Sequence, residues 1–182
     1  MTRRRTLLGS VGVIALLRPR FVVAADYLSV DAAQHLLFET ADLFREVTLT
    51  LTSTQRADMS RLAGPQPRHG ALRVWRAGLA GKALGYFFVD EVIGRQDLIT
   101  YAIAIDDRGV LGRIEILSYR ESHGGEIRSR RWRDQFNGRN SHEQLQFPTD
   151  IKNIAGATMS SEHVTQGVRW VLALWQTALK DL

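Results

Sequence analysis

Residues 154–161, which read IAGATMSS, introduce the last and clearest helix of the chain. The apolar residues after this stretch recur at i, i+3, i+4 and i+7, which places one apolar stripe against a core. The stripe consists of Val164, Val168, Val171, Leu172, Trp175, Ala178, Leu179 and Leu182. Either Ser160 or Ser161 can cap the first turn, and Glu162 suits the positive end of the helix. The sequence therefore predicts a C-terminal helix packed on a core.

The same stretch has the composition of an anion-binding site. The small residues at positions 155–157 let the backbone approach a ligand closely, and free N–H groups at the start of the helix can hold a phosphate. The hydroxyl groups of Thr158, Ser160 and Ser161 crowd the same place. An ordinary loop with an N-cap has the same pattern, so these residues alone indicate only an anion-binding helix terminus.

This stretch resembles the S-G-A-T attachment motif of the FMN-binding domain family. The family includes peripheral subunits of the sodium-translocating NADH:quinone reductase and of the Rnf complex, and a flavin transferase attaches FMN to the last threonine as a phosphoester. The resemblance places the attachment at Thr158, after Gly156 and Ala157, and implies FMN as the cofactor. The family has Asp six residues before the threonine and Ser or Thr three before it, where this chain has Lys152 and Ala155. Lys152 could instead pair with the phosphate of a flavin that is bound without a covalent bond.

A second conspicuous stretch, residues 119–126, reads YRESHGGE. Its two adjacent glycines allow positive φ and a close approach of the backbone, which by itself predicts a strand-to-helix turn. The stretch resembles the flavin-contacting loop of one branch of the family, with the pattern Y-R-E-S-x-G-G-E. The expected cofactor-binding residues are therefore Tyr119, Glu121, Ser122, Gly124, Gly125, Lys152, Gly156, Ala157, Thr158, Ser160 and Ser161.

The chain before these two stretches has the pattern of an antiparallel sheet between helices. The spacing of apolar residues predicts a helix that begins at Ser29 or Asp31 and extends as far as Val47. The alternation of apolar and polar residues predicts a strand over residues 47–52. A short helix is expected over residues 54–62. Four strands follow, at residues 72–75, 83–92, 99–105 and 110–119, with a hairpin turn at residues 107–109. The expected fold class is α+β: one domain whose antiparallel sheet is flanked by an N-terminal and a C-terminal helix.

Residues 1–25 have the pattern of an export signal. This segment contains five arginines, an apolar run at residues 11–17 and small residues before the expected cleavage point. Arg4-Arg5-Thr6 resembles the start of a twin-arginine signal. Residues 26–182 are then the FMN-binding domain, and the protein is expected in the periplasm or on the outer face of the cytoplasmic membrane.

Charge and composition exclude several classes of function. Of the 24 basic residues, five lie in residues 1–25, where there is no acidic residue, so the remaining 19 balance the 19 acidic residues. A neutral domain gives no support to a nucleic-acid partner. The chain has no cysteine, and its five histidines lack metal-binding spacing, so no metal site is expected.

Together these features predict an exported flavoprotein that relays electrons between a membrane-bound donor and an acceptor. The expected partners are a flavin transferase and a membrane-bound electron-transfer protein. The chain has no Gly-rich dinucleotide fingerprint, which favours an electron carrier over an independent dehydrogenase and leaves no residue expected to be catalytic. The alternative is an exported binding module without a redox role that holds a phosphate-bearing ligand.

Overall fold

A six-stranded antiparallel sheet forms the middle layer of the protein, as a computed structural model shows for residues 25–66, 70–121 and 123–182. The expected export signal lies, apart from Ala25, outside these described residues. The spatial order of the strands is β1-β6-β5-β4-β3-β2. The strands are β1 (Ala25–Asp26), β2 (Leu43–Glu46), β3 (Arg73–Leu79), β4 (Lys82–Ile93), β5 (Leu98–Asp106) and β6 (Leu111–Tyr119).

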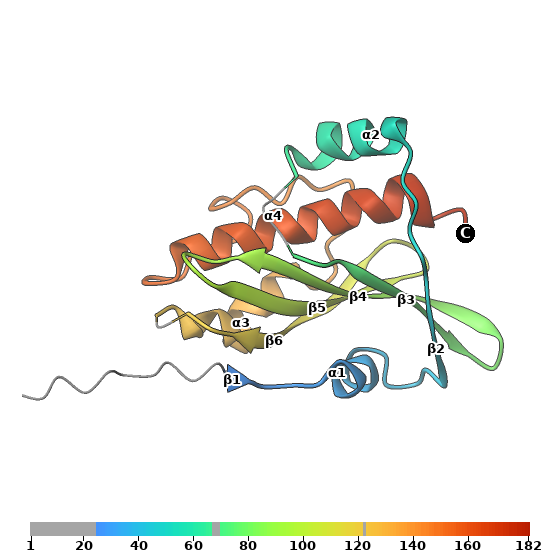
Figure 1. The fold of residues 1–182 in the computed structure, drawn as a ribbon, viewed down its shortest axis with the longest axis horizontal. Helices are drawn as coiled ribbons and strands as arrows, with labels where there is room; N and C mark the ends of the chain where they lie inside the picture. Colours follow the sequence, from blue (N-terminus) through green and yellow to red (C-terminus); the bar gives the residue numbers. More distant parts are fainter. Residues whose placement is uncertain (1–24, 67–69, 122) are drawn as a thin grey trace, which may run out of the picture.

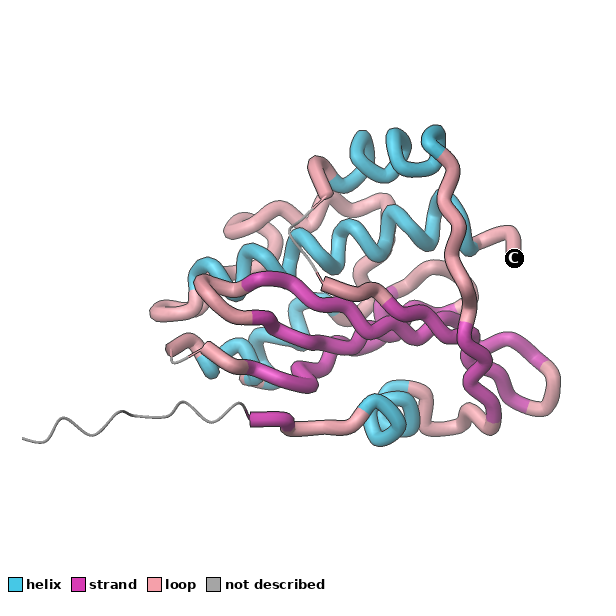
Figure 2. The backbone as a smooth tube through the Cα atoms, in the orientation of Figure 1, coloured by secondary structure: helices cyan, strands magenta, loops and turns pink. Residues whose placement is uncertain are grey.

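Helices cover both faces of this sheet (Figures 1 and 2). Helix α4 (Thr158–Leu174), continued by the π-helical turn η3 (Trp175–Leu179), lies along one face, and α2 (Ser53–Ala63) lies over α4. Helix α1 (Val30–Leu37) lies on the opposite face. The short helices η1 (Gly125–Arg128), α3 (Arg130–Arg133) and η2 (Asp134–Phe136) follow β6. The predicted α+β fold, with a helix on the sheet from each end of the chain, is confirmed.

The sheet is buried on both faces, and β4 shows this most clearly. Successive side chains of a strand point to opposite faces. Tyr86 and Phe88 accordingly belong to the large core under α4, whereas Phe87 and Val89 belong to the smaller core under α1. The predicted apolar stripe of α4 faces the larger core over most of its length, but Leu182 at its end is 68 % exposed.

A close contact fixes the position of α4 on the sheet. Gly167 of α4 lies against the Tyr101 hydroxyl group of β5, which donates a hydrogen bond to the carboxylate of Asp90 in β4. All three residues are in the interior, and a side chain at Gly167 would overlap the hydroxyl group. Burial, and secondarily the charge of Asp90, raises the pKa of Tyr101 well above its usual value, so the phenol remains a donor.

The prediction for residues 30–52 is wrong in two places. The first helix is capped by Ser29, one of the two residues expected to open it, and ends at Leu37, and Phe44 lies in β2. Phe44 packs edge-on against Phe38 and Phe87, so its apolar character serves a strand that follows the helix rather than the helix itself. Residues 47–52 form the connection from β2 to α2 rather than a strand.

Two other local predictions are confirmed. The turn at residues 107–109 joins β5 to β6, and Gly109 has the positive φ of 85° that such a turn requires. Helix α2 begins after Thr52, which forms a capping box with Gln55. Among the described residues, no helix is both long enough and apolar enough to span a bilayer.

Candidate functional site

A cleft of about 530 Å³ opens at the end of the sheet where α4 begins. Three segments form it: the β4–β5 turn, the loop that follows β6, and the start of α4, which meet at one end of the molecule in Figure 1. The volume is within the range of about 300–1,000 Å³ that is typical of small-molecule sites. The lining residues are Arg95, Gln96, Glu121, His123, Gly156, Ala157, Thr158, Met159 and Ser160.

The start of α4 has no side-chain cap. The helix begins at Thr158 with Ala157 in the N-cap position, so the prediction that Ser160 or Ser161 caps it is wrong. The first i to i+4 bond runs from Ser161 N to Ala157 O at 2.9 Å, and the three N–H groups before it have no partner within the helix. Gly156 has a φ of 83°, and a Cβ there would meet open space. The backbone therefore presents donors and the positive end of a helix dipole to the cleft.

The three hydroxyl groups of this turn have different surroundings. Ser161 is fully buried and donates to Ala157 O at 2.9 Å, which satisfies a backbone group of the helix itself. Ser160 lies 3.1 Å from the Tyr119 hydroxyl group. Thr158 is exposed, and its Oγ1 accepts a hydrogen bond from Asn153 Nδ2 at 3.0 Å. Of the three residues, only Thr158 is exposed, whereas Ser160 and Ser161 are buried.

Tyr119 ties the loop after β6 to the start of α4. Its hydroxyl group donates to His123 O and therefore accepts from Ser160 Oγ, because a phenol has one proton. Gly124, with a φ of 89°, brings the loop so close that a Cβ would lie 2.6 Å from this hydroxyl group and 3.1 Å from Ala157 Cβ. Burial raises the pKa of Tyr119, which keeps the hydroxyl group protonated.

Glu121 ties the β4–β5 turn to the same loop. Its carboxylate accepts from Gln96 N at 2.6 Å and from Asp97 N at 3.0 Å. His163 of α4 supports the turn from the other side, because its Nδ1 donates to Ile93 O. Glu121 therefore lies in the cleft as the sequence predicts, and its carboxylate also holds the turn that carries Arg95.

The predicted site residues fall into three groups. Five line the cleft: Glu121, Gly156, Ala157, Thr158 and Ser160. Tyr119, Gly124 and Ser161 lie behind the lining and fix its shape. The structure does not bring Gly125 or Lys152 into the cleft: Gly125 begins η1, and Lys152 donates to Thr149 O at 2.6 Å beside a different hollow next to Trp132. Ser122 lies outside the described residues.

The predicted site residues do not include four residues that line the cleft: Arg95, Gln96, His123 and Met159. They also do not include Asn153, which contacts Thr158. The turn at residues 94–97 was recognised, but nothing local showed that it would face a loop 25 residues later. Asn153 lies five residues before Thr158, and a polar residue just before a small-residue stretch is the signal that could have indicated it. Arg95 supplies the guanidinium group among the described residues that line the cleft.

Residues 94–173 match the FMN-binding domain family. The match begins at the β4–β5 turn and ends near the last residue of α4, so it includes every segment that forms the cleft. It indicates FMN as the cofactor. No curated protein matches the chain.

The chemistry of the cleft fits FMN. Backbone N–H groups at the start of α4 and the Arg95 guanidinium suit a phosphate, and Met159, which is 44 % exposed, offers an apolar surface to a ring system. Among the described residues, no group of three or more His, Asp or Glu side chains could hold a metal ion.

Proposed function

We propose that the protein is an exported flavoprotein that carries FMN on Thr158 as a phosphoester and relays electrons. The observation that carries the proposal is the position of Thr158. Its hydroxyl group is exposed at the cleft, on the first residue of α4, within the part of the chain that matches the FMN-binding domain family.

The surroundings of Thr158 support attachment. Asn153 donates to Oγ1, which orients the lone pairs and leaves the hydroxyl proton available to a base of the partner enzyme. The partner is a flavin transferase, and its co-substrate is a flavin nucleotide with a phosphoanhydride bond. The Oγ1–P bond forms as the anhydride breaks, and the departing nucleotide takes up the proton. The N–H groups of the first turn would be the donors that hold the phosphoryl oxygens.

The two departures from the family motif are compatible with this chemistry. Ala155 is exposed and has no hydroxyl group to contribute, and Lys152 is directed to Thr149 O. Asn153 is the residue that contacts the acceptor hydroxyl group, so the acceptor is oriented without the acidic residue of the family pattern.

The open cleft supports a relay rather than a dehydrogenase. FMN supplies the redox chemistry, since a flavin can accept two electrons and release them singly. The chain binds the phosphate and tunes the ring through Arg95, Glu121 and Met159. Donor and acceptor are separate proteins, one of them bound to the membrane, and both approach the same open side of the cleft.

The pattern of residues 1–25 supports export to the periplasm or to the outer face of the membrane. We expect replacement of Arg4 and Arg5 by Lys to retain the protein in the cytoplasm. Normal export of this variant would exclude the twin-arginine route.

The purified full chain, co-expressed with a flavin transferase, tests the function. It should be yellow, with the absorption bands of a flavin. Dithionite should bleach these bands, and NADH alone should leave them. A colourless protein would favour the alternative of a phosphate-binding module, and steady turnover of NADH would refute the relay.

A further inference from the structure

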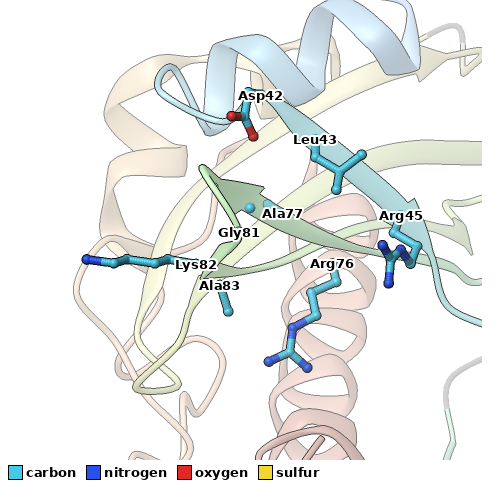
Figure 3. A pocket seen from close by; sticks show the side chains of 9 residues that line it. Asp42, Leu43, Arg45, Arg76, Ala77, Gly81, Lys82 and Ala83 are labelled. Atoms are coloured by element: carbon cyan, nitrogen blue, oxygen red, sulfur yellow. The ribbon is translucent and has the colours of Figure 1, made fainter.

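A second hollow, of about 270 Å³, is shown in Figure 3. It lies at the opposite end of the molecule (Figure 1) from the cleft at the start of α4, which we call the flavin cleft. The turn of the β3–β4 hairpin and strand β2 form the second hollow, whereas α4 starts at the other end of the sheet. Its lining residues are Asp42, Leu43, Arg45, Arg76, Ala77, Gly78, Gly81, Lys82 and Ala83. We call this hollow the hairpin hollow.

Two arginines lie side by side in this hollow. Arg45 of β2 and Arg76 of β3 are direct partners in the antiparallel register, so their side chains leave the sheet on the same face. Like charges in such positions destabilise a sheet. Arg76 stacks on the ring of Tyr86 and donates to its hydroxyl group at 3.0 Å, which fixes the guanidinium at the hollow. Among the described residues, neither arginine forms an ion pair with a carboxylate.

The rest of the lining does not neutralise this charge. Lys82, at the start of β4, is exposed and adds a third cation to the exposed Arg45 and the half-buried Arg76. Asp42 is the acidic residue of the lining, and its carboxylate accepts from Ala80 N at 2.9 Å at the hairpin turn. Three cations and one engaged carboxylate match an oxyanion with two negative charges or a surface of negative charge.

Exposed leucines accompany the cations. Leu43 is 50 % exposed at the mouth of the hollow, and Leu79, the last residue of β3, is 39 % exposed. Leu79 is the register partner of Lys82, so an apolar side chain and a cation are neighbours at the end of the hairpin. Apolar side chains beside cations are the combination that holds a protein at the surface of an anionic membrane.

We infer that the hairpin hollow docks the protein onto a membrane by binding the phosphate of anionic phospholipids, with Leu43 inserted between the headgroups. Arg45 and Arg76 hold a phosphate together, which relieves their repulsion. Docking at this end directs the flavin cleft away from the bilayer, because α4 starts at the far end of the sheet (Figure 1). The inference does not depend on bound flavin.

Vesicle co-sedimentation of the full chain tests this docking. The vesicles contain phosphatidylglycerol and phosphatidylcholine, with pure phosphatidylcholine vesicles for comparison. The double variant Arg45→Gln/Lys82→Gln should bind the anionic vesicles about 10- to 30-fold more weakly, since each cation near such a surface contributes roughly a five-fold gain. The matched control, Arg56→Gln/Arg131→Gln, removes two exposed cations of α2 and α3 and should bind as the parent chain does. All these variants retain the five arginines of residues 1–25.

Two further outcomes decide whether the binding comes from this site or from net charge alone, and whether the bound phosphate belongs to a lipid or to a soluble molecule. An equal loss in both double variants would overturn the docking site, because net charge alone would then explain the binding. Leu43→Asn should weaken vesicle binding and leave the affinity for inorganic phosphate unchanged. If Leu43→Asn has no effect on vesicle binding while inorganic phosphate competes fully, the hollow binds a soluble phosphate, and the membrane assignment is wrong.

Discussion

Replacing Gly124 by alanine should loosen the loop of the flavin cleft from α4. The new Cβ would lie 2.6 Å from the Tyr119 hydroxyl group and 3.1 Å from Ala157 Cβ, at a residue whose φ is 89°. A left-handed conformation costs a non-glycine residue about 1–2 kcal/mol. Movement of the Tyr119 hydroxyl group away from His123 O and Ser160 Oγ would lose two hydrogen bonds, each worth about 1 kcal/mol. The expected loss of unfolding free energy is therefore about 3 kcal/mol.

Thermal and urea unfolding of Gly124→Ala and of its neighbour Gly125→Ala measure this loss. Gly125 is the matched control, since a Cβ there meets nothing within 4 Å and its φ is not positive. A loss of 3 kcal/mol lowers Tm on the order of 10 °C for a chain of this length, whereas Gly125→Ala should change Tm by little. Equal effects of the two substitutions would refute the argument that Tyr119 and Gly124 clamp the loop to the helix.

Two other predictions concern the core and the cleft. Tyr101→Phe removes a buried hydrogen bond to the Asp90 carboxylate and should lower the unfolding free energy by about 1–3 kcal/mol in urea titrations at pH 7. The raised pKa of Tyr101 implies stability that is present below pH ~10 and lost as pH rises further, because the unfolded tyrosine then ionises first. Tyr101→Phe should therefore flatten the alkaline decline, and a parallel decline would contradict this origin. Arg95→Gln should weaken binding of free FMN to the Thr158→Ala chain about ten-fold, as expected for one charged hydrogen bond, while Arg108→Gln in the β5–β6 turn should not.

The sequence predicted correctly those turns and helices whose conformation depends on residues close together in the chain. The turn at residues 107–109 needs a positive φ at Gly109, and glycine provides it. The region of residues 38–52 was misread because its apolar residues serve partners that are distant in sequence. Leu49 and Leu51 alternate with polar residues and pack against the large core, yet no strand pairs with them, so the alternation reports burial alone.

In the flavin cleft, too, the sequence predicted the local features but not the contacts between distant residues. The small-residue stretch and Thr158 were visible in the sequence, but the different surroundings of the three hydroxyl groups were not. Ser160 contacts Tyr119, which lies 41 residues earlier in the chain. The turn that carries Arg95 is held by Glu121, which accepts hydrogen bonds from Gln96 N and Asp97 N. Contacts of this range depend on the sheet register, which a periodicity of apolar residues does not specify.

The most direct test of the account is the fluorescence of the protein after denaturing electrophoresis. The full chain, co-expressed with a flavin transferase, should retain flavin fluorescence under ultraviolet light, and Thr158→Ala should lose it. Ser161→Ala is the matched control, because that hydroxyl group is buried against Ala157 O, and the variant should fluoresce as the parent chain does. Fluorescence that survives in Thr158→Ala, or that is absent from a parent chain that is yellow before denaturation, would contradict attachment at Thr158.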